Sequence, residues 1–205
     1  MAGPQRTMDR RPVGAGDQRR EALLRALDEL LHETPLDAIA IADISARAGV
    51  TRSAFYFYFE NKAACVAALC ADVYVGGLAA AGHLADEGVP PARRIERMVD
   101  DLIASVRERH YLFRAVLEAR RTSSGIREMW TGYLESFVAP VAQHIDGERA
   151  AGRAPAGPDS QTLARLLLEL SDRMLEHLGP EDNPADRLRA QALAVVWLRS
   201  IYGVA

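Results

Sequence analysis

The chain has 205 residues, and its 25 basic and 28 acidic residues leave a net charge of −3 at pH 7. Hydrophobic residues make up 49% and charged residues 26%, a balance typical of globular proteins, which excludes a largely disordered or fibrous chain. No stretch reaches the roughly 18 apolar residues of a membrane span. Residues 1–20 are too polar for the core of a signal peptide, so we expect a cytoplasmic protein without membrane contact.

Cysteine and histidine usage gives no sign of a disulfide framework, a metal site or an enzyme. Cys65 and Cys70 are the only cysteines. Five residues apart on one helix, they face about 140° away from each other and cannot bridge. The five histidines match no metal-ligand spacing, and no nucleophile–base pattern or phosphate loop occurs. We therefore expect no catalytic residue, no metal and no cofactor.

Helical periodicity dominates the rest of the chain, and strand signals are weak. We expect an all-α fold of about nine helices after a disordered basic tail over residues 1–16. One of these helices carries a single apolar stripe made by Ile95, Met98, Val99, Leu102 and Val106. The other expected helices span residues 17–33, 41–48, 52–58, 61–86, 110–121, 125–151, 159–178 and 185–202. The long helix over 125–151 contains Pro140, which removes a backbone hydrogen bond and predicts a kink.

The most informative segment is IADISARAGVTRSAFYFYFENK, residues 41–62. A short helix ends at Gly49, where a left-handed residue costs little. Thr51 is a good N-cap for a second helix, which begins within about four residues of the first. This spacing is that of a helix-turn-helix, whose second helix enters the major groove of DNA.

The second helix of this motif has two different faces. At about 100° per residue, Arg52, Ser53, Tyr56 and Phe57 fall on one arc, whereas Ala54, Phe55 and Tyr58 fall on the other. We expect Phe55 and Phe59 to be buried. Five aromatic residues in a row cannot all face inward, so at least one of Tyr56 and Phe57 is exposed next to Arg52. Lys62 lies at the start of the next helix and is placed to contact a phosphate. The candidate DNA-binding residues are Arg47, Thr51, Arg52, Ser53, Tyr56, Phe57, Tyr58 and Lys62.

The segment GVTRSAFYFYFENKAACVAAL resembles the recognition segment of TetR-family transcriptional regulators, and FYFYF is similar to the EthR-type repressors within that family. ADISARAGV, HIDGERAAGRAP and VVWLRSIYG fit the same group, so the resemblance covers most of residues 17–203. It implies an all-helical homodimer that binds double-stranded DNA at a palindromic operator and is released by a small molecule. Leu168, Ser171 and Asp172 stand in a region where EthR-type repressors carry asparagines, so the resemblance does not identify the ligand.

The second half of the chain contains an aromatic set that is consistent with either plain core or a ligand cavity. Mainly apolar cavities with a few polar groups are the usual small-molecule sites, so we expect a pocket for an apolar effector. Ser171 and Asp172 are its candidate polar contacts. Arg173 points about 100° away from Asp172 and is a poor partner for that carboxylate. The candidate lining residues are Ile95, Met98, Val99, Leu102, Val106, Trp130, Tyr133, Leu134, Phe137, Leu168, Ser171, Asp172, Leu175 and Trp197.

The last two helices, 159–178 and 185–202, are apolar on more than one side, which favours burial against a second subunit. We expect Leu167→Arg or Val195→Arg to yield monomers or to unfold the chain. The expected organisation is a DNA-binding domain over 17–62 and a ligand-binding and dimerisation domain over 63–205, connected by the helix over 61–86. A helical enzyme and a helix-turn-helix used only as a protein-interaction scaffold remain as alternatives.

Overall fold

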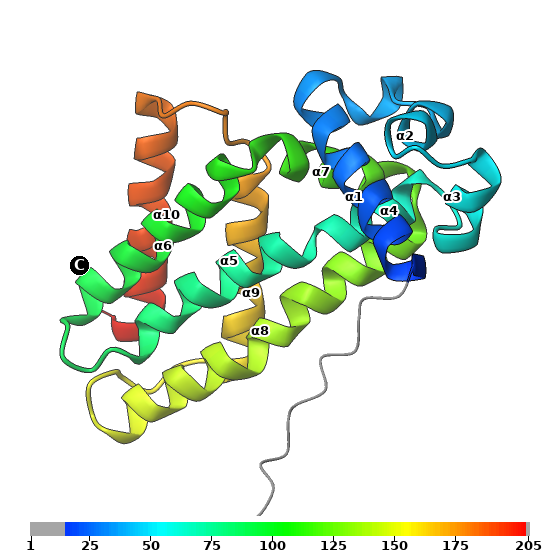
Figure 1. Cartoon of the computed structure of the whole chain (residues 1–205). Helices are drawn as coiled ribbons and strands as arrows, with labels where there is room; N and C mark the ends of the chain where they lie inside the picture. The colour runs from blue at the N-terminus through cyan, green and yellow to red at the C-terminus, as the bar shows by residue number, and fades with distance from the viewer. Residues whose placement is uncertain (1–14, 204–205) are drawn as a thin grey trace, which may run out of the picture.

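The computed structural model describes residues 15–203, and this part of the chain is entirely helical, without β-strands (Figure 1). Two short 3-10 helices, η1 (Leu36–Ala38) and η2 (Gly82–Ala85), interrupt the α-helices. None of the helices within this range is both long and apolar enough to cross a membrane. The expected all-α fold is confirmed. The α-helices are α1 (Ala15–Glu33), α2 (Ile41–Arg47), α3 (Arg52–Tyr58), α4 (Lys62–Leu69), α5 (Ala71–Ala81), α6 (Pro91–Glu108), α7 (His110–Thr122), α8 (Ser124–Ala150), α9 (Ser160–Leu175) and α10 (Pro184–Tyr202).

The expected helix boundaries differ from the structure by one to three residues at several ends, and one expected helix is divided. The first helix begins at Ala15, and residues 1–14 of the expected tail lie outside the described residues. The single helix expected over 61–86 is divided into α4, α5 and η2. At the first division the amide of Cys70 donates to Ala67 at 3.2 Å, while its thiol donates to the carbonyl of Val66 at 3.1 Å. This exchange of hydrogen bonds involves neither glycine nor proline, so the sequence pattern did not reveal it.

Helices α1 to α4 form a small unit around their own apolar core. Helix α1 packs against α2 and α4, and α2 packs against α3. Leu23 and Leu27 of α1, Ile44 of α2 and Phe55 of α3 are completely buried in this unit. The core therefore fixes α3 by one face and leaves its opposite face at the surface.

Helices α5 to α10 form a larger bundle. The long helix α8 packs along α9, while α6 packs between α5 and α10 (Figure 1). Glycine permits the close approach of α5 to its neighbours. A Cβ atom on Gly76 would lie 2.8 Å from the Cβ of Ser105 in α6, and one on Gly77 would lie 3.3 Å from the Phe137 ring in α8. The glycine pair therefore serves close packing.

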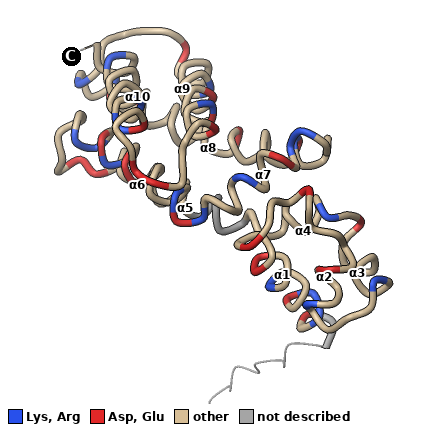
Figure 2. The backbone as a smooth tube through the Cα atoms, turned by 90° about the horizontal axis from the view of Figure 1, so that it is seen from above, with Lys and Arg blue, Asp and Glu red and all other residues tan. Residues whose placement is uncertain are grey.

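Helix α7 lies where the two units meet. It packs against α1, η1 and α4 on one side and against α8 on the other. The hydroxyl of Tyr111 donates to Asp28 of α1 at 2.8 Å, and its ring centroid lies 3.7 Å from that of His32. Figure 2 shows α1–α4 grouped at one end of the molecule and α9–α10 at the other. A movement of α7 relative to the bundle would therefore reach α1 directly.

Candidate nucleic-acid interface and ligand cavity

The turn between α2 and α3 has the local geometry that the sequence predicted. Gly49 adopts a φ of +66°, a left-handed conformation that suits glycine. The side chain of Thr51 accepts a hydrogen bond of 3.2 Å from the amide of Ala54 and so caps α3. Because α2 and α3 are only seven residues each, this cap and the turn are a large part of what orients α3.

The aromatic run divides between surface and core as expected. Phe55 and Phe59 are buried, whereas 47% of Tyr56 and 81% of Phe57 is exposed. The guanidinium of Arg52 donates to the Tyr56 hydroxyl at 3.3 Å and lies 5.7 Å from its ring centroid. The phenyl ring of Phe57 leaves apolar surface in water in the isolated protein, and with the Arg52–Tyr56 pair on the same helix this points to a binding surface.

Two other candidate DNA-binding residues have different surroundings. Ser53 is exposed on the same face as Arg52. Tyr58 is half-buried against the core, with its ring centroid 4.9 Å from that of Phe57. This position agrees with the inward arc that the helical wheel gave for Tyr58, and it limits what its ring can reach. DNA contact by these residues stays a prediction.

Lys62 and Arg47 are engaged within the protein. The ammonium group of Lys62 donates to the carbonyl oxygens of Leu36 and Ile39, the latter at 2.6 Å. These carbonyls belong to η1 and the segment just after it, so Lys62 stabilises the connection between α1 and α2. Arg47 forms two hydrogen bonds with Glu33, at 2.7 and 3.0 Å, which lower the pKa of that carboxyl. In this conformation both cations already bind groups within the protein, and their contacts with DNA phosphates stay predictions.

Arg20 is a cation that sequence reasoning did not single out. Its guanidinium lies 5.4 Å from the centroid of the Phe59 ring, and its side chain is exposed at the start of α1. It therefore adds positive charge near the end of α3. The available signal was the pair Arg19–Arg20 in the first turns of the predicted first helix.

An internal cavity of about 100 Å³, which we call the inner cavity, lies between α5, α6, α7, α8, α9 and α10. Twelve of the fourteen predicted ligand-binding residues line it; Ile95 and Val99 do not. Both are buried on α6, and Val99 faces α10 instead, because the apolar stripe of α6 is wide enough to serve two neighbours. Phe113 of α7 also lines the cavity and was not among the predicted residues. The lining residues are Gly77, Ala80, Ala81, Met98, Leu102, Ser105, Val106, Phe113, Trp130, Tyr133, Leu134, Phe137, Val141, Leu168, Ser171, Asp172, Leu175 and Trp197.

Both polar candidates of the inner cavity already have partners. Asp172 accepts hydrogen bonds from Arg120 of α7, at 3.1 and 3.4 Å, and from the indole N–H of Trp130 at 2.9 Å. Ser171 accepts from the indole of Trp197 at 3.1 Å and donates to the carbonyl of Leu167 at 2.8 Å. The sequence correctly excluded Arg173 as the partner of Asp172, but Arg120 was missed because it comes from another helix. Asp172 thus joins the cavity wall to α7.

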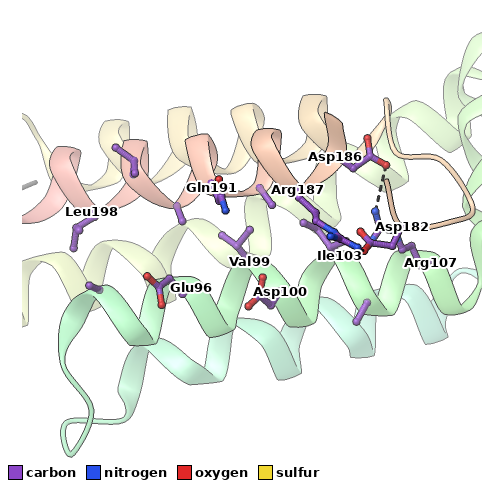
Figure 3. A pocket seen from close by; sticks show the side chains of 15 residues that line it. Glu96, Val99, Asp100, Ile103, Arg107, Asp182, Asp186, Arg187, Gln191 and Leu198 are labelled. Atoms are coloured by element: carbon purple, nitrogen blue, oxygen red, sulfur yellow. Dashed lines mark hydrogen bonds and ion pairs between the residues drawn. The ribbon is translucent and has the colours of Figure 1, made fainter. Parts of the chain in front are cut away.

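A larger groove of about 680 Å³ lies on the outside of the bundle, between α6 and α10 (Figure 3). Glu96 and Asp100 of α6 lie along it, and an ion pair of 3.3 Å between Arg107 and Asp186 lies at one end. Partial burial, reinforced by the nearby carboxylates of Glu96 and Asp101, raises the pKa of Asp100. This charged lining does not suit an apolar ligand, so the inner cavity is the better candidate.

The outer surfaces of α9 and α10 carry exposed apolar side chains. Leu166 and Leu170 of α9 are exposed, as are Leu188, Val195 and Val196 of α10. Leu167 is buried within the bundle instead. Leu167→Arg would therefore damage the core, and it is not a useful probe of an interface.

The fold and the surface of α3 define an all-helical DNA-binding protein with a helix-turn-helix at its N-terminal end and a second, helical domain behind it. Two family profiles match the chain: "Bacterial regulatory proteins, tetR family" over residues 23–69 and "Transcriptional regulator EthR, C-terminal domain" over residues 95–203. The chain belongs to the TetR family of transcriptional regulators and carries an EthR-type C-terminal domain. It is a DNA-binding regulator and not an enzyme.

Individual relatives agree with this assignment. The chain is 30% identical over 193 residues to the HTH-type transcriptional regulator EthR of Mycolicibacterium smegmatis, covering 92% of this chain and 88% of that protein. EthR of Mycobacterium tuberculosis is 30% identical over 195 residues, with 92% and 89% covered. Among solved structures, Salmonella enterica GusR superposes with a TM-score of 0.67 at 17% identity, covering 95% of this chain and all of the other. The last similarity supports the fold alone.

Proposed function

We propose that the chain is a homodimeric repressor that binds a palindromic operator through α3 and leaves it when a small apolar ligand enters the inner cavity. The exposure of Phe57 and Tyr56 beside Arg52, on a helix whose opposite face is buried, is the observation that carries the DNA-binding part. Arg52 and Ser53 are placed to select bases, because they lie on the exposed face of α3. Thr51, Tyr56, Phe57, Tyr58, Lys62 and Arg47 are assigned contacts with the sugar-phosphate backbone of the DNA.

We assign dimerisation to the exposed apolar faces of α9 and α10. A two-fold axis would pair Leu166, Leu170, Leu188, Val195 and Val196 with their copies, which would remove these side chains from water. The same axis would place the two α3 helices on successive turns of the major groove, roughly 34–36 Å apart, as a palindromic operator requires. In this organisation residues 17–62 bind DNA in the cytoplasm, 63–205 bind the ligand and the second subunit, and the segment 61–86 connects them.

Ligand release would act by linkage between the two sites. The inner cavity of about 100 Å³ is smaller than the roughly 300–1,000 Å³ usual for ligand sites, so a ligand must push its walls apart. Two of these walls, α5 and α7, run toward the DNA-binding unit. A ligand that prefers the widened conformation lowers the affinity for DNA by its differential affinity for the two conformations.

A cavity-filling substitution tests this coupling. Leu134→Trp places an indole in the inner cavity, whereas Glu135→Gln changes the next residue on the exposed side of α8. We expect Leu134→Trp either to weaken DNA binding, because it mimics a ligand, or to block ligand release while DNA binding persists. Binding is measured by fluorescence anisotropy with DNA from the region upstream of the gene. If a folded Leu134→Trp protein keeps both wild-type DNA affinity and wild-type ligand release, the coupling through this cavity is refuted.

A further inference from the structure

A further groove, separate from the one between α6 and α10, adjoins the inner cavity on the side of α5 and η2. This outer groove, of about 700 Å³, is lined by α5, η2, α8 and the charged side chains of Arg94, Glu148 and Arg153. Ala81, Phe137 and Val141 line both the inner cavity and the outer groove. The two hollows therefore share a wall only one layer of side chains thick.

Phe137 is the side chain of this wall whose rotation would change its shape most. It is the largest of the three shared side chains, and it is only half-buried. Its ring lies against Gly77 of α5, where a Cβ atom would come within 3.3 Å of the ring tip. Pro140 follows within one helical turn of α8 and has no N–H to donate one turn back, so the backbone that carries Phe137 lacks one helical restraint. Rotation of Phe137 would join the two hollows into one channel.

In the outer groove two guanidinium groups, those of Arg94 and Arg153, surround one buried carboxylate. Arg94 and Glu148 are 3% and 2% exposed, and Glu148 is shared by two guanidinium groups. Arg153 holds Glu148 closely, at 2.8 and 3.0 Å, whereas Arg94 reaches it only at 3.4 and 3.5 Å. The Nε–H of Arg94 finds no hydrogen-bond partner among the described residues. Glu87 lies 3.8 Å from Arg153 but is largely exposed and screened by water.

We propose that the natural ligand is an aliphatic carboxylate whose head binds Arg94 and Arg153 in the outer groove and whose chain passes Phe137 into the inner cavity. Nη1 of Arg94 already donates to the carbonyl of Leu84 at 2.9 Å. The head would take up the weakly paired Nη2 and the unpartnered Nε of Arg94 together with the half-exposed guanidinium of Arg153, because ionised carboxylates are the preferred bidentate partners of arginine. The chain would meet the apolar side chains around Trp130 and Phe113. This inference rests on the proposed function, since it identifies the ligand class of the same cavity.

Calorimetry with a homologous series tests the ligand class. From butanoate to decanoate, affinity should rise about fourfold for each added methylene, because each buries further apolar surface. Octanoate should bind about tenfold more tightly than the neutral 1-octanol, since only the carboxylate meets the arginines. Equal affinity for octanoate and 1-octanol, or no binding of octanoate, would overturn the proposal.

Two matched arginine variants locate the head group. Arg153→Gln should remove the preference for octanoate and leave 1-octanol binding unchanged. Arg165→Gln is the control, because Arg165 is similarly exposed (43% against 45%) and is also paired with a glutamate, but lies outside both hollows. Circular dichroism checks that both variants are folded. If the two variants affect octanoate binding equally, the assignment of the head group to the outer groove is wrong.

In this proposal Phe137 acts as a gate between the two hollows, and the association rate of octanoate tests this role. Phe137→Ala should raise the association rate of octanoate about tenfold in stopped-flow tryptophan fluorescence, because the wall between the hollows is removed. Met129→Ala, at a half-buried residue of α8 outside both hollows, should leave this rate unchanged. Equal rates for the two variants would refute the gate.

DNA binding separates this proposal from the proposed function. If octanoate binds in an Arg153-dependent way but does not displace DNA, the ligand site stands and ligand release is refuted. If 1-octanol displaces DNA and octanoate does not bind, the proposed function stands and the carboxylate ligand is refuted.

Discussion

The two ends of the molecule use the same residue types in opposite ways. In the DNA-binding unit, Arg52, Tyr56 and Phe57 lie at the surface of a short helix. In the bundle, aromatic and arginine side chains turn inward, where Trp130 and Arg120 meet at Asp172. Burial makes the second set part of the fold, while exposure leaves the first set available for a partner. Substitutions in the two regions should therefore change stability by very different amounts.

Phe55 and Phe57 provide the sharpest contrast, because they lie two residues apart on α3. Phe55→Ala should cost about 3–5 kcal/mol of unfolding free energy, since it leaves a cavity in a fully packed core. Phe57→Ala should change stability by less than about 0.5 kcal/mol, since the ring is largely exposed. It should still weaken DNA binding about tenfold. Urea unfolding and DNA anisotropy measure both quantities. A large loss of stability in Phe57→Ala would show that its ring is structural.

The buried carboxylate of Glu148 predicts acid sensitivity in the bundle. Hydrogen bonds from Arg153 and the charge of Arg94 lower its pKa to about 2. Because this folded-state pKa is below the unfolded value, Glu148 stabilises the fold near neutral pH, and the contribution disappears as pH falls toward 2. The contribution is on the order of 3 kcal/mol at pH 7.

A variant pair isolates this effect. Glu148→Gln should lower the melting temperature strongly at pH 7 and hardly at all near pH 2, measured by calorimetry. Glu135→Gln is the control, because the ion pair of Glu135 with Arg165 is exposed and contributes little. A pH-independent loss of stability in Glu148→Gln would contradict the assigned role of its charge.

Substitution of Lys62 tests whether its side chain both stabilises the fold and contacts DNA. Lys62→Ala removes two hydrogen bonds to backbone carbonyls and should cost roughly 1–3 kcal/mol. If Lys62 also contacts a phosphate, the salt dependence of DNA binding should decrease by about one unit in slope. Lys62→Met keeps much of the aliphatic stem and separates charge from packing. An unchanged slope in a folded variant would remove Lys62 from the DNA-binding set.

The smallest change in stability is expected at the proposed dimer interface. Leu188→Arg, at a side chain that is 66% exposed, should leave protomer stability within about 0.5 kcal/mol but produce monomers. Leu167→Arg should instead unfold the bundle. Light scattering at micromolar concentration measures the difference. A wild-type monomer, or a dimeric Leu188→Arg protein, would place the interface elsewhere or exclude it.

Local features were predictable because they depend on neighbouring residues. The turn at Gly49, the cap at Thr51 and the two faces of α3 follow from backbone preferences and helical periodicity. Most of the inner cavity also followed, since its lining repeats at helical spacing. One failure involves a contact distant in sequence, because Arg120 reaches Asp172 across 52 residues. The other is local: at Cys70 the backbone turns to a three-residue hydrogen bond with Ala67 without a glycine or proline to mark it.

The account depends most directly on sequence-specific DNA binding by the exposed face of α3. Fluorescence anisotropy with DNA from upstream of the gene, against a shuffled fragment of the same composition, measures this at fixed salt. We expect the wild-type protein to prefer the upstream DNA by about 10³-fold or more. Arg52→Ala should reduce this preference without unfolding the protein. Equal affinity for the two fragments would contradict the account.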